Sequence, residues 1–439
     1  MKKKMRTERY VVRHEYFGGL VYDRKKDLNF LIDCEFFELL ATLVSMSESQ
    51  INQSIEKEVL CFLKDEGFLD GETIDYKIIN NTISGETLSA PGRVHFYYTS
   101  ACNLNCAHCY TRCSTGKKEL RYDEKIALLD QMCRLGINEI LIGGGEPFVK
   151  SDFPDFVEAC LERNISTKVY TNGILLNDRE LVKRIAKWDL KFLSVSIDGA
   201  DEEEYEKTRG IKGLSIIKES LKMLNKECSF KIDASVTVNC NNYKNAEKLL
   251  ALIADLGFDR VKIRPVKPAG NALNNEVCLT AEQYIFFIKQ AQTFWNQKYK
   301  DTFKIKFSWG DVRLVYDPQQ NVVIPIDTVS PYQKFGCYAG NVNVVIDSSG
   351  NVIPCGFLPE KMGKSVYNNL RKKSIKEVWD NGDNFSVLRN LEGNKICREC
   401  EYYGVCRGGC ITRKLFFGLD ANAQDPWCLK KYFPVMLGS

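Results

Sequence analysis

The sequence predicts an α/β protein in three parts: a small winged-helix-like unit, a partial (β/α)6 barrel of the TIM-like kind, and a cysteine-rich tail. Its 439 residues, 44% of them hydrophobic, suffice for two or three domains of ordinary size. Strand-like and helix-like segments alternate six times in the middle of the chain, as βα units do. The 18 cysteines stand in a chain without an export signal, which favours metal ligation over disulfides.

Composition and charge argue against several classes of protein. The chain has 61 Lys and Arg against 57 Asp and Glu, a net charge of +4, so it lacks the large excess of basic residues that is typical of proteins that bind nucleic acid. No run of about 18 apolar residues occurs, and the opening MKKKMRTERY leads into charged sequence rather than an apolar signal core. We therefore expect a cytoplasmic protein with no membrane and no nucleic-acid partner.

The first unit, residues 1–85, combines a β-hairpin with two helices. Residues 10–32 alternate in the manner of strands. Apolar side chains then fall at helical spacing in residues 36–43 and again in residues 51–63, until Gly67 ends the second helix. The pattern predicts a winged-helix-like unit.

Such a unit has two possible kinds of partner. A DNA-binding unit would present a recognition helix rich in Lys and Arg, but the second helix carries Glu56 and Glu58 beside the single Lys57. Peptide binding therefore suits the unit better. The polar stretch of residues 80–92 follows as a linker.

The barrel is expected in residues 86–309. Its strand candidates are residues 94–99, 139–142, 168–170, 192–197, 231–238 and 260–264. Helical stretches alternate with them, among them residues 125–135, 178–188, 213–224, 245–256 and 281–299. Repeated βα units imply a parallel sheet, and ligands bind at the carboxyl ends of its strands.

The first cysteine group follows the first barrel strand directly. Cys102, Cys106 and Cys109 share one tight loop at spacings x3 and x2, and each can hold one iron of a [4Fe-4S] cube. The fourth iron then stays open and can chelate a small ligand through an amine and a carboxylate. The alternative is a zinc loop completed by His95, His108 or Cys113.

The motif Cys102-x3-Cys106-x2-Cys109, followed by Gly-Gly-Gly-Glu-Pro at residues 143–147 after the next strand, resembles the radical S-adenosylmethionine (SAM) enzymes. The resemblance implies that the open iron binds the methionine moiety of SAM and that the glycine-rich segment meets its amino group. Segments 170–173, 194–199 and 264–270 resemble further cofactor-lining loops. By this resemblance the SAM contacts are His108, Gly144, Gly145, Glu146, Pro147, Thr171, Asn172, Ser196, Asp198, Arg209 and Val266. Each of three of these residues also has an ordinary structural interpretation. Asn172 could be the stop before a helix, Asp198 a turn residue, and Arg209 a surface cation.

The second cysteine group lies in residues 310–439. Its members are Cys337, Cys355, Cys397, Cys400, Cys406, Cys410 and Cys428. Their intervals resemble the SPASM extension of radical SAM enzymes, which carries two auxiliary clusters. A zinc ribbon would use four of the seven and leave three unexplained.

Matching the cysteines of this chain to the SPASM pattern, position by position, assigns ligands to both auxiliary clusters. The outer cluster would be held by Cys397, Cys400, Cys406 and Cys428. The inner cluster would be held by Cys337, Cys355 and Cys410. Some relatives have a fourth inner ligand where this chain has Asn343. We hypothesise that Cys113 replaces it; the alternative is a buried or free loop thiol.

Together the three parts resemble a peptide maturase of the radical SAM and SPASM type. The resemblance implies three [4Fe-4S] clusters, SAM, and a reductant such as flavodoxin or ferredoxin. Reductive cleavage of SAM would yield a 5′-deoxyadenosyl radical that abstracts hydrogen from carbon. The amino-terminal unit resembles the element that binds leader peptides of ribosomally made natural products, often by adding a strand to a sheet edge. A precursor peptide with a leader is therefore the expected substrate.

These motifs do not specify the bond that is formed. Length and layout are similar to the streptide-type enzymes that join a lysine carbon to a tryptophan carbon, so an intrapeptide crosslink is the first expectation. A thioether-forming maturase and an anaerobic sulfatase maturase have nearly the same cysteines, although the amino-terminal unit counts against the latter. Outside this class, the rivals are an iron–sulfur scaffold without catalysis and a DNA-binding redox sensor. The motifs indicate no general base.

Overall fold

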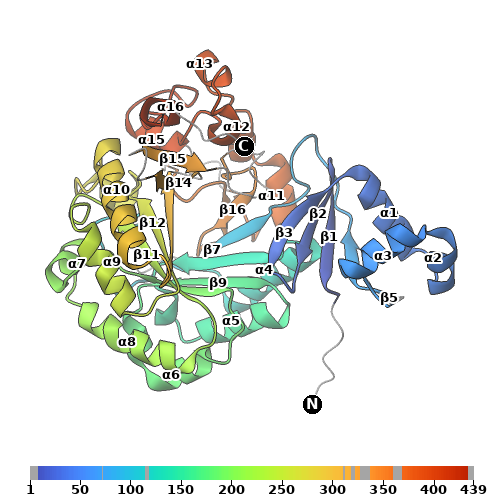
Figure 1. Ribbon diagram of the computed structural model, residues 1–439, viewed down its shortest axis with the longest axis horizontal. Helices are drawn as coiled ribbons and strands as arrows, with labels where there is room; N and C mark the ends of the chain where they lie inside the picture. The colour runs from blue at the N-terminus through green and yellow to red at the C-terminus, as the bar shows by residue number, and fades with distance from the viewer. Residues whose placement is uncertain are drawn as a thin grey trace.

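The computed structural model describes residues 8–71, 73–113, 118–309, 312–317, 322–326, 337–358 and 368–433. Figure 1 shows the amino-terminal unit on the right, the barrel on the left and the carboxyl-terminal region above the barrel. The amino-terminal unit has its own hydrophobic core, while a second core runs through the barrel and the tail. The predicted α/β class with a partial barrel is confirmed.

The amino-terminal unit is a four-stranded sheet covered by helices. Its strand order is β3-β2-β1-β6, with β6 parallel to β1 and the other neighbours antiparallel. Its elements are β1 (Tyr10–Glu15), β2 (Gly18–Asp23), β3 (Leu28–Ile32), α1 (Cys34–Val44), α2 (Glu48–Ser54), α3 (Lys57–Asp65), β4 (Leu69–Asp70), β5 (Thr73–Ile74) and β6 (Tyr76–Ile79).

One prediction for this unit was wrong: the expected second helix is two helices, α2 and α3. The chain is extended at Ile55, with φ −104° and ψ 133°, and the Glu56 carbonyl then accepts the Leu60 N–H at 2.9 Å to begin α3. Ile51 and Leu63 remain buried on either side of the break. Because the apolar spacing continues across it, the break leaves no trace in the sequence pattern.

A buried ion pair joins this unit to the barrel. Arg13 Nε and Glu15 Oε1 lie 2.7 Å apart, and their side chains are 1% and 0% exposed. Arg13 also donates to the Pro91 carbonyl at 2.8 Å, and Glu15 accepts the Ser89 N–H at 2.6 Å. The stretch expected as a linker is therefore packed at residues 88–92.

The barrel is a run of parallel strands with helices on its outer side (Figure 1). Strands β7 to β13 are successive parallel neighbours, so the six predicted strands are confirmed and β13 is a seventh. The elements are β7 (Arg93–Thr99), α4 (Tyr122–Arg134), β8 (Glu139–Gly144), η1 (Pro147–Val149), α5 (Phe153–Glu162), β9 (Ser166–Thr171), η2 (Ile174–Asn177), α6 (Arg179–Ile185), β10 (Phe192–Ser196), α7 (Glu202–Arg209), α8 (Leu214–Glu227), β11 (Ile232–Val238), α9 (Ala246–Asp255), β12 (Arg260–Pro265), η3 (Gly270–Leu273), α10 (Ala281–Lys298) and β13 (Lys304–Trp309).

The sheet continues beyond the barrel on both sides. Two antiparallel strands, β14 (Val312–Asp317) and β15 (Val322–Ile326), follow β13 and extend the sheet. On the other edge, β16 pairs in parallel with β7. The remaining elements are β16 (Asn343–Ile346), β17 (Asn351–Ile353), β18 (Asn368–Asn369), α11 (Ile375–Asn381), α12 (Asp383–Arg389), α13 (Lys395–Arg398), α14 (Tyr403–Cys406), α15 (Ile411–Phe416) and α16 (Leu429–Tyr432).

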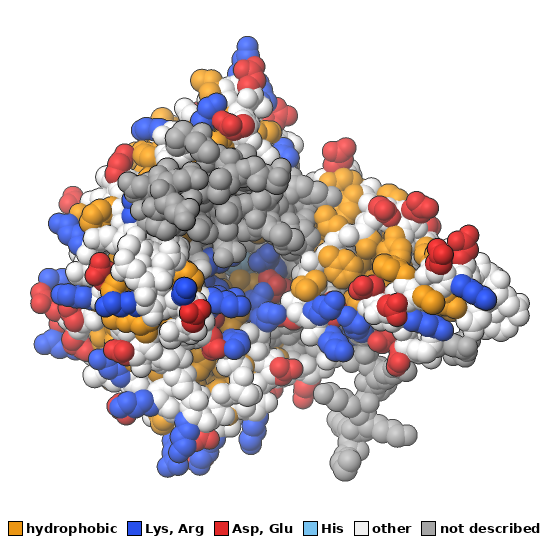
Figure 2. Space-filling view, viewed as in Figure 1, with side chains coloured by type: hydrophobic (Ala, Val, Ile, Leu, Met, Phe, Trp, Pro, Cys, Tyr) orange, Lys and Arg blue, Asp and Glu red, His pale blue; other side chains and the backbone are white. Residues whose placement is uncertain are grey.

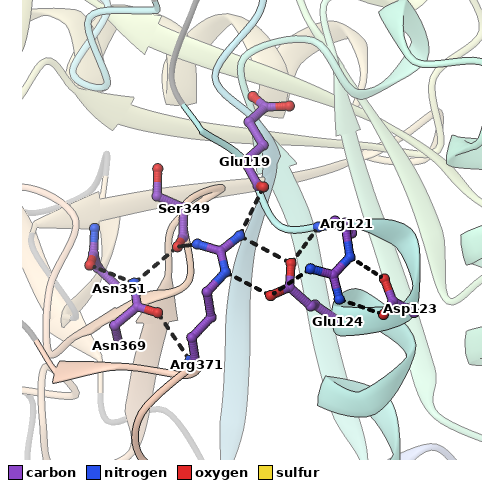
Figure 3. A network of polar contacts seen from close by, with 8 residues as sticks. All are labelled: Glu119, Arg121, Asp123, Glu124, Ser349, Asn351, Asn369 and Arg371. Carbon is purple, nitrogen blue, oxygen red and sulfur yellow. Dashed lines mark hydrogen bonds and ion pairs between the residues drawn. The ribbon is translucent and has the colours of Figure 1, made fainter.

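A polar network fixes the tail to the barrel (Figure 3). Arg371 donates to the two carboxylate oxygens of Glu124, on α4, at 2.6 and 3.0 Å, and to the carbonyls of Glu119 and Ser349 at 2.9 and 3.1 Å. Arg121, at the start of α4, pairs with Asp123 beside it. Because Glu119 also binds the first cysteine loop, Arg371 links the tail to that loop. Among the described residues, no helix combines the length and apolar character that crossing a membrane requires.

Candidate functional site

Strand β7 ends at Thr99 and leads into the first cysteine loop. Glu119 accepts hydrogen bonds from Thr99 Oγ1 at 2.8 Å and from the Ser100 N–H at 2.6 Å, and its other oxygen pairs with Lys150 at 2.9 Å. Burial alone would raise the pKa of Glu119, but these donors hold it at about 2. The ionised carboxylate therefore anchors the start of the loop.

Two neighbouring helices, α7 and η3, hold the cysteine loop through its backbone. The Ala107 N–H donates to the Thr208 carbonyl at 3.0 Å. Asn271 donates its side chain to the Cys106 carbonyl at 3.1 Å and its N–H to the Cys109 carbonyl at 2.8 Å. The protein itself therefore fixes the positions from which the thiols project.

The glycine-rich segment packs against the cysteine loop. Gly144 has φ 114°, and the Gly145 N–H donates to the last carbonyl of β7 at 2.8 Å. A Cβ on Gly145 would stand 1.9 Å from the Ala101 carbonyl oxygen, so only glycine allows this approach. The Glu146 N–H donates to the same Ala101 oxygen at 2.9 Å, and Pro147 opens η1.

Glu146 is the buried carboxylate of this segment, with 1% of the residue exposed. It accepts hydrogen bonds from Thr171 Oγ1 at 2.8 Å and from the Asn172 N–H at 2.7 Å. Burial raises its pKa to about 7 against the influence of these donors. Asn172 also donates to Asn103 of the cysteine loop at 2.8 Å. Three predicted SAM contacts thus form one hydrogen-bonded group beside that loop.

Asp198, just after β10, joins two more of the predicted residues to a cysteine. It is fully buried, pairs with the Arg209 guanidinium, and lies 3.3 Å from His108 Nε2. Burial would raise its pKa, but Arg209 and His108 hold it at about 2. Arg209 Nη1 lies 3.6 Å from Cys106 Sγ. An ionised carboxylate therefore orients a guanidinium against a predicted iron ligand.

Ser196 and Val266 lie at the carboxyl ends of two further strands. Ser196 is the last residue of β10 and is partly exposed. Val266 follows β12, is 6% exposed, and donates its N–H to the Val238 carbonyl at 2.8 Å. In the part of the chain that the structure describes, no hydrogen bond links either side chain to Glu146 or Asp198.

Cys113 lies with the first cysteine group. Its Sγ is 3.7 Å from Cys109 Sγ and 3.2 Å from Thr111 Oγ1. Its hydrogen bond to Cys102 lowers the pKa of the Cys102 thiol. The loop therefore brings a fourth thiol next to two of the predicted ligands of the first cluster.

Four cysteines of the tail line one pocket. Gln424 donates to Cys428 Sγ at 3.1 Å, and the Asn394 side chain accepts the Cys397 N–H at 3.0 Å. The pocket cysteines are Cys397, Cys400, Cys406 and Cys428. These are the four residues that the resemblance gives to the outer cluster.

Cys410 lies among charged groups. Lys267, in the loop after β12, has its Nζ 3.7 Å from Cys410 Sγ. Asp425 accepts the Cys410 N–H at 2.6 Å and forms a two-point ion pair with Arg413, also at 2.6 Å. Burial would raise the pKa of the thiol, but Lys267 and Arg413 lower it below its usual value. The surroundings favour the thiolate, the form that binds iron.

The other two inner candidates lie in the segment of residues 337–358. The ring of Phe357, two residues after Cys355, packs in a tilted arrangement against Tyr110 of the first cysteine loop, with 4.6 Å between the ring centroids. The ring centroid of Tyr110 lies 6.0 Å from that of Tyr97 on β7. Cys337 stands at the start of this segment, before β16. The segment therefore borders the first cysteine loop.

The sequence analysis missed three polar residues of this site: Glu119, Lys267 and Asn271. Lys267 lies inside the segment 264–270 that had been singled out, so its position was indicated but its partner was not. Glu119 and Asn271 stand among ordinary polar residues. Their contacts are made across the fold, and no local pattern reveals them.

The thiols suit clusters of several irons. A [4Fe-4S] cube takes one thiolate at each of its separated irons. Cys102, Cys106 and Cys109 on one fixed loop, with Arg209 against one sulfur, fit this arrangement.

Comparison with known proteins agrees with these features. A model of the radical SAM superfamily matches residues 96–232, and a model of SPASM, an iron-sulfur cluster-binding domain, matches residues 337–401. Mycofactocin maturase MftC of Mycolicibacterium smegmatis is 28% identical over 350 residues, which are 78% of this chain and 84% of that protein. PqqA peptide cyclase of Granulibacter bethesdensis is 23% identical over 351 residues, 78% of this chain and 88% of that protein.

The fold is similar to that of a solved peptide-bound structure. SuiB of Streptococcus suis bound to precursor peptide SuiA has a TM-score of 0.75 and 16% identity, over 96% of this chain and 99% of SuiB. The matched domains give the chain iron–sulfur clusters and SAM as cofactors. The chain therefore contains a radical SAM domain and a SPASM domain, as its cysteine spacing predicted.

Proposed function

We propose that this chain is a maturase of a ribosomally made precursor peptide and that it forms a crosslink within that peptide. The observation that carries the proposal is the layout of an amino-terminal sheet-and-helix unit, a radical SAM barrel and a SPASM tail in one chain. Support comes from the likeness in fold to SuiB, which was solved with a precursor peptide, and from the sequence relatives named as a maturase and a peptide cyclase. A lysine–tryptophan carbon–carbon bond is our first expectation.

We assign residues 1–85 to peptide recognition, 86–309 to the barrel and 310–439 to the SPASM domain. In this proposal three [4Fe-4S] clusters are bound. The first is held by Cys102, Cys106 and Cys109. The outer auxiliary cluster is held by Cys397, Cys400, Cys406 and Cys428, and the inner one by Cys337, Cys355 and Cys410. The shared pocket of the four outer thiols supports this grouping.

Cys113 is our candidate for the fourth ligand of the inner cluster. Its contacts with Cys102 and Cys109 keep a second possibility open, namely that it serves the first cluster. Mössbauer and paramagnetic resonance spectra of Cys113→Ala separate the two. A changed inner-cluster signal supports the assignment, whereas a change confined to the SAM-responsive cluster contradicts it.

When bound, the first cluster and SAM supply a 5′-deoxyadenosyl radical that takes a hydrogen atom from a substrate carbon. The protein's own task is to bind and orient. Arg209, fixed by Asp198, presents its guanidinium for the SAM carboxylate, and the Glu146 carboxylate suits the SAM amino group. His108, Thr171 and Asn172 hold these charged groups in place.

The peptide is expected to meet the amino-terminal unit at β3, which is an edge strand of its sheet. An edge strand can pair with an added peptide strand. Figure 2 shows a hydrophobic patch on this unit. Among the large apolar side chains of the unit, Leu28 of β3 is 42% exposed and Phe62 of α3 is 49% exposed. Backbone pairing and apolar contact together would hold a leader. A flavodoxin or ferredoxin in the cytoplasm is the expected reductant.

The test is an anaerobic incubation of the reconstituted enzyme with dithionite, SAM and candidate precursor peptides. We expect 5′-deoxyadenosine and a peptide lighter by two hydrogens, with tandem fragmentation locating the bond. Alkylation of cysteines distinguishes a thioether from a carbon–carbon bond, and a formylglycine product would indicate sulfatase maturation. Absence of 5′-deoxyadenosine from native protein with full iron content would favour a scaffold and contradict the proposal; Cys106→Ala is the inactive control.

A further inference from the structure

The inner face of the barrel carries a stripe of cations on β12. Alternate residues of this strand, Val261 and Ile263, are fully buried toward the helices. The residues between them, Arg260, Lys262 and Arg264, therefore face the interior, where each keeps partial exposure. A core position normally carries an apolar side chain, so three cations in one row require an explanation.

Acidic partners account for the deeper cations. On β12, Arg260 and Lys262 share Asp233 of the neighbouring strand, at 2.6 and 2.9 Å. Across the barrel, Glu139 is shared at 3.3 and 2.5 Å by the cations of β7 and β9, Arg93 and Lys168. Each of these carboxylates is thus already occupied by two cations.

Arg264 has no such partner: it makes no hydrogen bond or ion pair with another residue that the structure describes. Its charge acts on three rings around the interior, those of His95 on β7, Tyr110 in the loop after β7, and Tyr170 on β9. Burial lowers the pKa of His95 to about 3, so this ring is neutral. Burial raises the pKa of Tyr170, which is therefore un-ionised as well. No carboxylate among these neighbours balances the guanidinium.

Among the described side chains named above, five cations stand against two carboxylates, and Arg264 shares neither carboxylate. In Figure 2, Lys and Arg side chains gather in the hollow between the barrel and the amino-terminal unit. A partly exposed guanidinium that shares no carboxylate with the other described residues is well suited to bind a carboxylate at two points. Arg264 stands at the carboxyl end of β12, and the SAM carboxylate is already assigned to Arg209, so we assign Arg264 to a different carboxylate.

We propose that Arg264 binds a carboxylate of the substrate peptide inside the barrel and so selects a peptide that is acidic near its reacting residue. The inference rests on the proposed function, because it takes the barrel interior as the place where the peptide reacts. The carboxylate belongs either to an Asp or Glu side chain or to the carboxyl terminus of the peptide. Both sources present the same group to the guanidinium.

The experiment uses three N-acetylated hexapeptides on the anaerobic holoenzyme with SAM bound. They are Ac-GKGEGW with an amidated end, Ac-GKGQGW with an amidated end, and Ac-GKGQGW with a free carboxylate. Affinities are measured by calorimetry for the native chain, Arg264→Gln and Arg264→Lys. Arg179→Gln, which removes an exposed arginine on α6, is the matched control.

We expect one charged peptide to bind the native chain and the control about tenfold more tightly than the neutral peptide, as charge-assisted hydrogen bonds do. That preference should vanish in Arg264→Gln and persist in weaker form in Arg264→Lys. The charged peptide that is preferred identifies the source of the carboxylate. Equal affinities of the native chain for all three peptides, including no binding at all, overturn the inference, as does a preference that survives in Arg264→Gln.

The same preparation is assayed for 5′-deoxyadenosine, so the two proposals fail separately. A native chain that cleaves SAM but shows no preference for charge keeps the proposed function and loses this inference. A native chain that prefers the carboxylate but does not cleave SAM loses the proposed function alone. The native-chain comparison does not depend on any variant folding.

Discussion

Two buried carboxylates at the strand ends differ in charge because their neighbours differ. Asp198 faces a guanidinium, which holds its pKa at about 2, whereas Glu146 is surrounded by neutral donors and its pKa rises to about 7. At neutral pH the first is ionised and the second is partly protonated. The same residue class thus provides a fixed counterion for Arg209 in one place and a titratable acceptor in the other.

The raised pKa of Glu146 makes stability depend on pH. Its folded pKa of about 7 exceeds the ordinary value of 4.5, so its contribution is fully present below about pH 4.5 and is lost as the pH rises through about 7. We expect the melting temperature of SAM-free protein to fall from pH 6 to 8, and to fall less in Glu146→Gln, by the equivalent of about 1–3 kcal/mol. Glu203→Gln, on an exposed face of α7, is the control, and equal pH slopes in native protein and Glu146→Gln would contradict the assignment.

Arg209 is expected to tune the first cluster. Replacing it with Gln removes a positive charge and an N–H donor 3.6 Å from Cys106 Sγ, while Asp198 stays negative. Both losses disfavour the reduced cluster, so its midpoint potential should fall by roughly 40–130 mV, the equivalent of about 1–3 kcal/mol. Redox titration followed by paramagnetic resonance measures this. Adding Asp198→Asn should restore part of the shift; an unchanged potential in the single variant would remove Arg209 from this role.

At the scale of single residues, the sequence predicted those whose type is tied to a motif. Glu146 and Asn172 stand in short segments next to strand ends, and the structure joins them by a hydrogen bond. Glu119 and Arg264 could not be predicted in the same way. Their roles depend on the groups that the fold brings near them. Glu119 meets hydrogen-bond donors of the cysteine loop, and Arg264 meets neutral aromatic rings.

Among the elements, the glycine-rich turn after β8 limits how closely the cysteine loop can pack. Gly145→Ala would force a methyl group to within 1.9 Å of the Ala101 oxygen, so the loop must shift. We expect lower iron content after reconstitution and a melting temperature reduced by the equivalent of about 2 kcal/mol or more. The matched control is Gly404→Ala in α14, where an added Cβ meets nothing within 4 Å. Native iron content in Gly145→Ala would show that the loop is not limited by this contact.

The boundaries of helices and strands were predicted where the spacing of apolar residues and the positions of turn residues agree. The six barrel strands satisfy both conditions. Strand β13 was missed although its sequence, KIKFSW, alternates polar and apolar residues, because it follows the long helix α10 without a clear turn signal. The break between α2 and α3 was missed for the opposite reason, since the apolar spacing runs through it unchanged.

For the whole molecule, the three parts share interfaces that the sequence did not indicate. Strand β16 of the tail pairs with β7 of the barrel, and Arg371 of the tail binds Glu124 of α4. These contacts link residues that are far apart in the chain. Composition and residue spacing do not predict such contacts. The segment that bears Cys355 also borders the first cysteine loop, through the contact of Phe357 with Tyr110.

The junction between the amino-terminal unit and the barrel gives the last prediction. Arg13 and Glu15 are almost completely buried as an ion pair, so Arg13→Met would leave the Glu15 carboxylate buried without its cation. Loss of one partner of a buried pair costs about 3–5 kcal/mol, whereas replacing both partners with apolar residues costs much less. We expect Arg13→Met to lower the melting temperature and expose residues 88–92 to protease, and the double variant Arg13→Met/Glu15→Leu to recover much of the loss. If the double variant is no more stable than the single one, the backbone hydrogen bonds to Ser89 and Pro91, rather than the charge pair, hold the junction.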